Sequence, residues 1–226
     1  YLAYMHLILS QSNNNQHPHS EQHLANVCFT VVWFIACGNK TDRGDFMEPL
    51  RKDLILKGAQ IYLRPICAAD TDRVVRWRND KNVVKNFIYR IPLSKEAHLD
   101  WLKNRVEQGF VHQFVICENV NDMPLGSIYL QNFEAEHKKA EEGIFLGEEA
   151  YGKGIGTEAA KLMLKYAFDQ LCLHKVVARV LAYNQASVRM HEKAGYVQEA
   201  YFRQELFLDG KYEDLIFFGA INPFDK

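Results

Sequence analysis

The sequence predicts a mixed α/β (α+β) domain whose central sheet is mostly antiparallel and is flanked by helices. Three observations carry this prediction. Strand-like alternation and helical spacing of apolar residues occur in turn along the chain, Asp209-Gly210 marks a hairpin between two β-rich segments, and a glycine-rich loop at residues 151–157 joins a strand to an amphipathic helix. Apolar residues make up 48% of the 226 residues, which is enough for the core of one domain.

Residues 1–46 are predicted to lie outside this domain. Residues 10–23 are rich in Gln, Asn, Ser and His, a composition typical of disordered sequence. Residues 27–37 are apolar, but about eleven residues are too few to span a bilayer, and no basic segment precedes them as in a signal peptide. Met47 resembles a natural start. We expect residues 1–46 to be a disordered extension or sequence foreign to the natural protein, with a genuine N-terminal arm as the alternative, and residues 47–226 to form the domain.

The first elements of the domain are predicted to be one strand and three helices. Residues 61–64 alternate and end at Pro65, which favours a strand. Apolar residues then recur among charges, and Ser94 is a suitable N-cap for the longest helix. The predicted helices cover residues 68–78, 80–87 and 94–106.

Three strands are predicted next, at residues 112–118, 125–133 and 139–146. The turn-rich segment 119–124 makes the first two of them a hairpin. Helical spacing then dominates residues 159–171, and a β-rich segment follows at 175–182. A short helix at 187–194 is closed by Gly195, and residues 197–208 and 212–220 form the last hairpin.

Charge and cysteine content exclude several classes of protein. The chain has 27 Lys and Arg against 28 Asp and Glu, so it lacks the basic excess of a nucleic-acid-binding domain. The five cysteines are odd in number and include no C-x-x-C pair, which argues against a disulfide framework or a zinc site. We therefore expect no bound metal, no nucleic-acid or membrane partner, and a reducing, cytoplasmic setting.

The glycine-rich loop predicts an anion site. Gly152, Gly154 and Gly156 let the backbone turn tightly, and the following helix adds the positive end of its dipole. The backbone N–H groups that would face a pyrophosphate are those of Lys153, Ile155 and Thr157. A tight turn without a ligand is the alternative. The spacing fits neither a Walker A loop nor a Rossmann fingerprint.

Two ordered motifs in this sequence resemble those of the GNAT superfamily of N-acetyltransferases. The acyl-CoA loop motif Gln/Arg-x-x-Gly-x-Gly/Ala is matched over residues 151–156, with Tyr151 where Gln or Arg is usual. The motif Asn-x-x-Ala-x-x-x-Tyr-x-Lys-x-Gly-Phe is matched over residues 184–196, with Ser187, His191 and Tyr196 as departures. The resemblance covers residues 61–221 and is greatest to the branch of ribosomal-protein alanine and spermidine N-acetyltransferases.

The resemblance implies how acetyl-CoA would bind. Two parallel strands, near residues 144–146 and 177–181, would splay apart, and free backbone groups of the first strand would bond the pantetheine arm. The residues expected to contact the cofactor are Ile144, Phe145, Leu146, Tyr151, Gly152, Lys153, Gly154, Ile155, Gly156, Thr157, Asn184 and Ser187. The alternative for Asn184 and Ser187 is a capping or first-turn role in the helix that begins there.

The resemblance also implies the catalytic groups. His191 stands where the family's Tyr protonates the departing thiolate, and an imidazole can perform that role; packing in the core is the alternative. Glu141 matches an acidic position of the branch and is expected to be the base. The alternative is that Glu141 is a surface carboxylate without a catalytic role. Alternation places Glu142 on the opposite face of the strand. A backbone N–H near Leu146 would stabilise the oxyanion.

The function expected from these motifs is transfer of an acetyl group from acetyl-CoA to a primary amine of a small molecule or a peptide N-terminus. A non-catalytic acyl-CoA sensor of the same fold is the alternative, and an unrelated nucleotide-binding α/β domain is a third reading. A homodimer is expected from the resemblance alone. The acceptor would contact the early helices and the last hairpin, at candidates Trp77, Arg78, Asn79, Phe87, Tyr89, Trp101, Tyr201, Arg203 and Glu205, among which Trp101 fits the core better.

Overall fold

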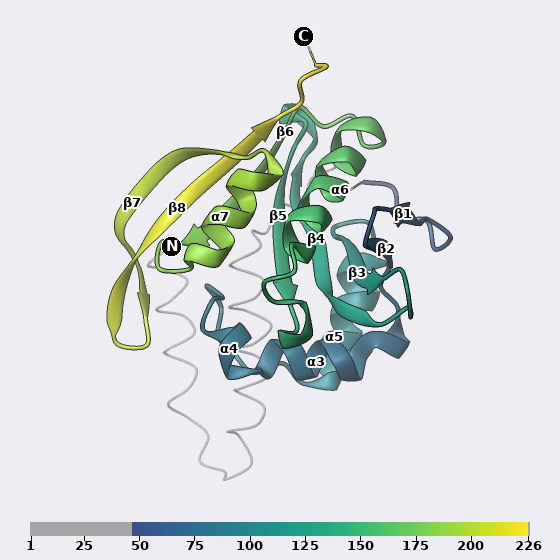
Figure 1. Ribbon diagram of the computed structural model, residues 1–226, viewed down its shortest axis with the longest axis horizontal. Coiled ribbons are helices and arrows are strands. Elements are labelled where there is room, and N and C mark those ends of the chain that lie inside the picture. Colours follow the sequence, from purple (N-terminus) through teal and green to yellow (C-terminus); the bar gives the residue numbers. More distant parts are fainter. Residues whose placement is uncertain (1–46, 226) are drawn as a thin grey trace, which may run out of the picture. The chain divides into compact units, whose positions relative to one another are not determined.

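A computed structural model describes residues 47–225 of the chain, and the predicted extension of residues 1–46 lies outside them. The described residues form an eight-stranded sheet in the order β1-β2-β3-β4-β5-β6-β8-β7, flanked by helices (Figure 1). All neighbouring strands are antiparallel except β5 and β6, which are parallel. This confirms the predicted fold class.

The first five strands follow one another in both sequence and space. They are β1 Leu56–Lys57, β2 Ile61–Pro65, β3 His112–Glu118, β4 Pro124–Glu134 and β5 Lys139–Leu146. β3 and β4 form the predicted hairpin. Only β1 was missed, because two residues are too few to show an alternating pattern.

The helices between β2 and β3 cover one face of the sheet. After a 3₁₀ turn at Ala68–Asp70 come α3 Thr71–Asn79, α4 Lys81–Val84 and α5 Lys95–Trp101, which continues as a π-helical turn, Leu102–Val106. The Ser94 hydroxyl accepts from the Ala97 N–H at 3.1 Å, so the predicted N-cap is confirmed. Val74, Trp77 and Leu102 pack with Val115 and Phe145 of the sheet.

The opposite face is covered by the two later helices, α6 Ile155–Asp169 and α7 Gln185–Ala194, which lie on the same side of the sheet (Figure 1). Alternation along β3 explains the division: Phe114 and Ile116 pack in the core that contains α6, while Val115 packs in the other core. α7 ends at Gly195, whose φ of 109° is the left-handed conformation expected after a helix.

The remaining strands are β6 Lys175–Leu181, β7 Val197–Leu208 and β8 Lys211–Ile221. β7 and β8 form the predicted hairpin around Asp209 and Gly210, both with positive φ. No helix among residues 47–225 is long and apolar enough to cross a membrane.

Candidate active site

The pairing between the parallel strands β5 and β6 ends near the middle of both strands. Residues 139–141 pair with residues 175–177, whereas β5 continues to Leu146 and β6 to Leu181. On its other side β5 stays paired with β4 as far as Leu146. The Gly147 N–H donates to the Leu125 carbonyl of β4, so by alternation the backbone groups of Phe145 also face β4, whereas those of Ile144 and Leu146 face the side of β6. The backbone groups of Ile144 and Leu146 that a full ladder would bond to β6 are therefore available to a ligand, as the predicted splay requires.

The glycine-rich loop lies directly after β5, beyond a 3₁₀ turn at Glu148–Ala150. Gly152 and Gly154 have φ of 73° and 80°, and a Cβ at either position would meet nothing within 4 Å. Gly154 is the N-cap of α6, and the first intrahelical bond is donated by the Glu158 N–H to the Gly154 carbonyl. The N–H groups of the preceding helical residues are thus left for another acceptor, which suits an anion.

The predicted loop residues divide into exposed and buried ones. Tyr151, Gly152, Lys153 and Gly154 are exposed, whereas the Ile155 side chain is 3% exposed and anchors the start of α6 in the core. Tyr151 is 47% exposed, so its phenol is free to lie along a ligand at the loop.

The start of α7 brings Asn184 and Ser187 together. The Asn184 Oδ1 accepts from the Ser187 N–H at 3.2 Å, which makes Asn184 the N-cap, the alternative role that the sequence suggested. Ser187 is half-buried, and its Oγ lies 3.3 Å from the His191 Nδ1.

His191 is buried, with 3% of its surface exposed. Its Nδ1 donates to the Ser187 carbonyl oxygen at 2.9 Å, and its Nε2 lies 3.7 Å from the Glu142 Oε1. The ring stacks on Phe218 with 5.5 Å between centroids and meets Tyr196 edge-on at 5.1 Å. Burial lowers the pKa of His191 to about 4, although its bond to Ser187 opposes the shift.

Glu141 and Glu142 point to opposite faces of β5, as alternation predicted. The Glu141 Oε1 accepts from the Arg179 Nε of β6 at 2.9 Å, and its Oε2 accepts from the Asn132 amide at 3.0 Å. The Glu142 Oε2 instead accepts from the Tyr196 hydroxyl at 2.7 Å in the interior. Burial raises the pKa of Glu142 to about 8.

Comparison with known proteins decides the family. A family model described as an acetyltransferase (GNAT) domain matches residues 60–197. The chain belongs to the GNAT acetyltransferase family. It is 29% identical over 180 residues to a "Probable N-acetyltransferase", YjcK, of Bacillus subtilis, covering 76% of this chain and 99% of the relative. It is 27% identical to a spermidine N(1)-acetyltransferase of Vibrio cholerae, covering 70% of this chain and 90% of the relative.

Solved structures agree with this assignment at the level of the fold. A crystal structure of spermidine N-acetyltransferase from Vibrio cholerae, in complex with CoA and spermine, matches with a TM-score of 0.69 and 23% identity. The match covers 73% of this chain and 97% of that one.

The face of this acetyltransferase that carries Glu141 also holds four of the nine predicted acceptor residues, Trp77, Arg78, Phe87 and Trp101. The Arg78 guanidinium lies 3.7 Å from the centre of the Phe87 ring, and Phe87 contacts Phe145 of β5 at 5.8 Å between centroids. Trp77 meets Phe145 edge-on at 6.3 Å. Trp101 packs beside this core and donates from its Nε1 to Gln113 at 2.8 Å, in line with the core role that the sequence favoured.

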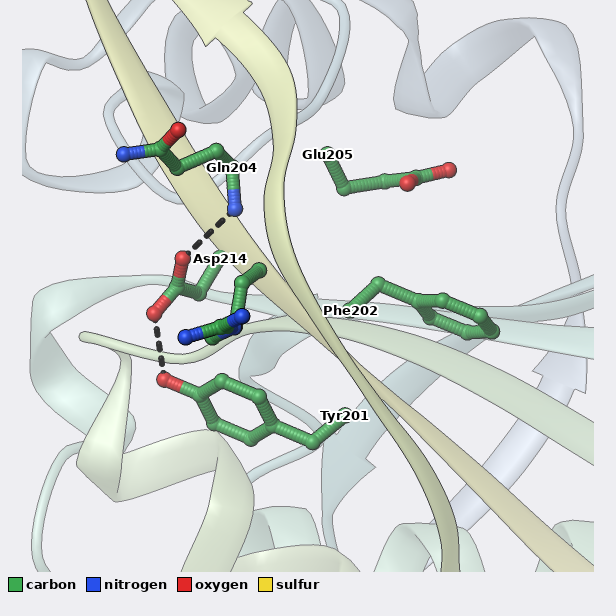
Figure 2. A pocket seen from close by; sticks show the side chains of 6 residues that line it. Tyr201, Phe202, Gln204, Glu205 and Asp214 are labelled. Carbon is green, nitrogen blue, oxygen red and sulfur yellow. Dashed lines mark hydrogen bonds between the residues drawn. The ribbon is translucent and has the colours of Figure 1, made fainter.

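The candidates on β7 lie in an irregular part of the strand. In a regular strand Tyr201, Arg203 and Glu205 would share one face, but Gln204 has a φ of 53° and the register with β8 shifts between Phe202 and Leu206. The irregularity disrupts the alternation, and the three residues instead line a polar groove together with Phe202, Gln204 and Asp214 (Figure 2). In that groove Asp214 accepts from the Tyr201 hydroxyl and the Gln204 N–H.

Sequence reasoning missed the roles of Glu142, Tyr196 and Arg179 in the acetyltransferase. A signal for Glu142 was present: it alternates with Ala140 and Ile144, so it shares the face that packs on the later helices. Arg179 had no such signal, because its pairing with Glu141 arises only where the two strands meet.

Proposed function

We propose that this protein transfers the acetyl group of acetyl-CoA to a primary amine of a small molecule or a peptide N-terminus. The observation that carries the proposal is the end of β5–β6 pairing after Glu141, directly before a glycine-rich loop and the N-terminus of α6. This places free strand backbone and helical N–H groups in one continuous stretch, matching a ligand with an amide-bearing arm and a pyrophosphate. The spermidine N-acetyltransferases among the relatives make a polyamine one candidate acceptor.

The residues proposed to hold acetyl-CoA are those of the open strand edge and the loop. The backbone of Ile144 and Leu146, on either side of Phe145, would bond the pantetheine arm, and the Leu146 N–H would meet the thioester oxygen. The loop N–H groups would bond the pyrophosphate, with the Thr157 hydroxyl as an added donor and Lys153 as a countercharge. Asn184 supports this site by capping α7.

Acetyl transfer needs a proton acceptor on the amine side and a proton donor on the sulfur side. We assign the acceptor role to Glu141, which lies on the face of Arg78 and Phe87 and whose carboxylate is fixed by Arg179. We assign the donor role to His191 together with Ser187, since the half-buried serine hydroxyl is the more accessible of the two. No metal is needed for either role.

The proposed setting is the cytoplasm, with the protein acting as a homodimer. Cys67, Cys117 and Cys172 are free thiols among residues 47–225, which is compatible with a reducing compartment. β7 is a long strand at the edge of the sheet with exposed Phe202 and Phe207, which favours an interface there.

The test is release of free CoA from acetyl-CoA in the presence of a panel of amines, including polyamines, amino sugars and short peptides. The expected result is turnover with at least one member. Tight CoA binding without turnover by any of them would favour an acyl-CoA sensor instead. The observation that favours this second function is the burial of His191, which stands at the position of the family's usual acid, because a buried imidazole has less access to the departing thiolate.

A further inference from the structure

Glu142 is a buried carboxyl group with an incomplete set of partners. The residue is 3% exposed. Its Oε2 accepts from the Tyr196 hydroxyl, whereas its Oε1 has no hydrogen-bond partner among residues 47–225. Burying an ionised carboxylate with an unpaired oxygen destabilises the fold. A carboxyl group in this position is therefore either protonated or retained because it has a functional role.

The atom that faces the unpartnered oxygen is the His191 Nε2, at 3.7 Å. Because the His191 Nδ1 contacts a carbonyl oxygen, which can only accept, the hydrogen of the neutral ring lies on Nδ1 and Nε2 carries a lone pair. Stacking on Phe218 and edge contact with Tyr196 hold the ring in this orientation. A proton on the Glu142 Oε1 would therefore face the unprotonated Nε2 of His191, which can accept it.

These groups lie where the strands β5 and β6 separate. Glu142 comes one residue after Glu141, which makes the last register pair with β6. Ser187 lies one helical turn before His191 on α7, with its Oγ 3.3 Å from Nδ1. Glu142, His191 and Ser187 thus form a line of proton-carrying atoms that runs from the interior to the half-buried Ser187 hydroxyl.

We propose that Glu142 is a positioning residue for acetyl transfer, which orients His191 and supplies it with the proton that Ser187 passes to the departing sulfur. The inference rests on the proposed function. As the acceptor nitrogen bonds the carbonyl carbon, the carbon–sulfur bond breaks and its electron pair stays on sulfur. The sulfur takes the Ser187 hydroxyl proton, Ser187 takes the Nδ1 proton of His191, and Nε2 takes the proton of Glu142. The acceptor nitrogen releases one proton to solvent through Glu141. Solvent returns one proton through Ser187 to the Nδ1 of His191, while Nε2 gives its proton back to Glu142, so both groups regain their starting states.

The surroundings of Glu142 agree with a proton held there at neutral pH. Burial raises its pKa to about 8, while burial lowers the pKa of His191 to about 4. The titratable groups facing the carboxyl are His191 on α7 and Tyr196 just after it, and the pKa of Tyr196 is raised by burial. The register neighbour on β4 is Leu130, and α6 packs apolar residues on the sheet, namely Ala159, Ala160 and Met163.

The test compares wild type with Glu142→Gln, which keeps the shape, the bond from Tyr196 and an N–H facing His191. We expect kcat to fall at least tenfold, with the KM for acetyl-CoA changed less than twofold. Wild-type kcat should also decline as pH rises through about 8, the pKa of Glu142, and the variant should lack this decline. A Glu142→Gln enzyme with wild-type kcat and pH profile would overturn the inference.

Tyr196→Phe provides a second variant, since Phe is the residue usual at this place in the motif. The tyrosine hydroxyl lowers the pKa of Glu142, so its removal should move the alkaline decline of kcat to higher pH. An unmoved decline would count against Glu142 as its source.

Nitrogen NMR of the His191 ring separates this inference from the proposed function, because it needs no turnover. The ring shifts should change between pH 7 and 9 in wild type and stay constant in Glu142→Gln. Absence of the change in wild type refutes the coupling, even if amines are acetylated. A change without acetylation of any amine would refute the proposed function and the catalytic part of the inference, leaving only the proton coupling.

Discussion

Gly156 lies so close to Met190 that a Cβ at Gly156 would stand 2.9 Å from the Met190 Sδ. The same Cβ would lie 3.3 Å from a methyl group of Leu146. The first turn of α6, the middle of α7 and the end of β5 are therefore in direct contact at this point. The small side chain at Gly156 is needed for packing, in addition to any role in binding phosphate.

Gly156→Ala should lower the free energy of unfolding by about 1–3 kcal/mol, the usual cost of overpacking a core. It should also raise the KM for acetyl-CoA, because Leu146 would be displaced. Urea unfolding and steady-state kinetics measure both effects. Adding Met190→Ala should restore part of the stability; a double variant no more stable than Gly156→Ala would contradict the contact as the cause.

Comparing Gly154→Ala with Gly210→Ala distinguishes an effect of backbone strain from an effect on ligand binding. Gly154 and Gly210 have φ of 80° and 85°, and a Cβ meets nothing within 4 Å at either one. Alanine should therefore cost about 1 kcal/mol of stability at both positions. Only Gly154→Ala should weaken CoA binding, measured by calorimetry, because Gly210 lies in the hairpin turn away from the loop. Equal loss of affinity in both variants would argue against the loop as the phosphate site.

Glu141→Gln tests the assigned base. The amide cannot take a proton from the acceptor, so kcat should fall at least tenfold, which corresponds to about 1.4 kcal/mol in the barrier. Arg179→Met is the control, since it removes the partner of Glu141 but leaves the carboxylate. It should lower stability by about 1 kcal/mol or less, as the pair is partly exposed. Unchanged kcat in Glu141→Gln would remove Glu141 from the mechanism.

Buried histidines should make the fold sensitive to acid. Burial lowers the pKa of His98 to about 4, as it does for His112 and His191. A pKa below the unfolded value means that stability is complete above about pH 6.5 and is lost as pH falls toward 4. On going from pH 7 to pH 5, each of these histidines should lower the free energy of unfolding by about 2 kcal/mol.

His98→Met tests this for one residue. His98 is 2% exposed and its only hydrogen bond in the described part of the chain is to Thr71, so methionine can fill its place. The difference in the free energy of unfolding between pH 7 and 5 should be smaller in the variant by about 2 kcal/mol. A variant as acid-sensitive as wild type would show that His98 does not carry the effect.

The order and type of nearly every element could be predicted from sequence, because each carries a strong periodic or capping signal. Strand β5 and the cap at Ser94 are examples. The irregularity at Gln204 could not be predicted, since a positive φ at a residue other than glycine depends on the acceptor that Asp214 offers from β8.

The site was predictable in its backbone parts and less so in its side chains. The alternating glycines at residues 152–156, together with the strand before them and the helix after them, predicted the loop. The burial of His191 follows from its helical spacing with Val188 and Ala194, which are also buried. Its contact with Glu142 joins two residues almost fifty positions apart, and local patterns carry no information about such pairs. The choice of Glu141 as the base stays a prediction.

The short ladder between β5 and β6 also divides the sheet into two sets of strands. Strands β1 to β5 pair in chain order, each with the next. β6 pairs with β5 at only residues 175–177, but with β8 along its whole length. Most of the backbone pairing that holds β6 in the sheet therefore comes from residues 211–221, the last strand.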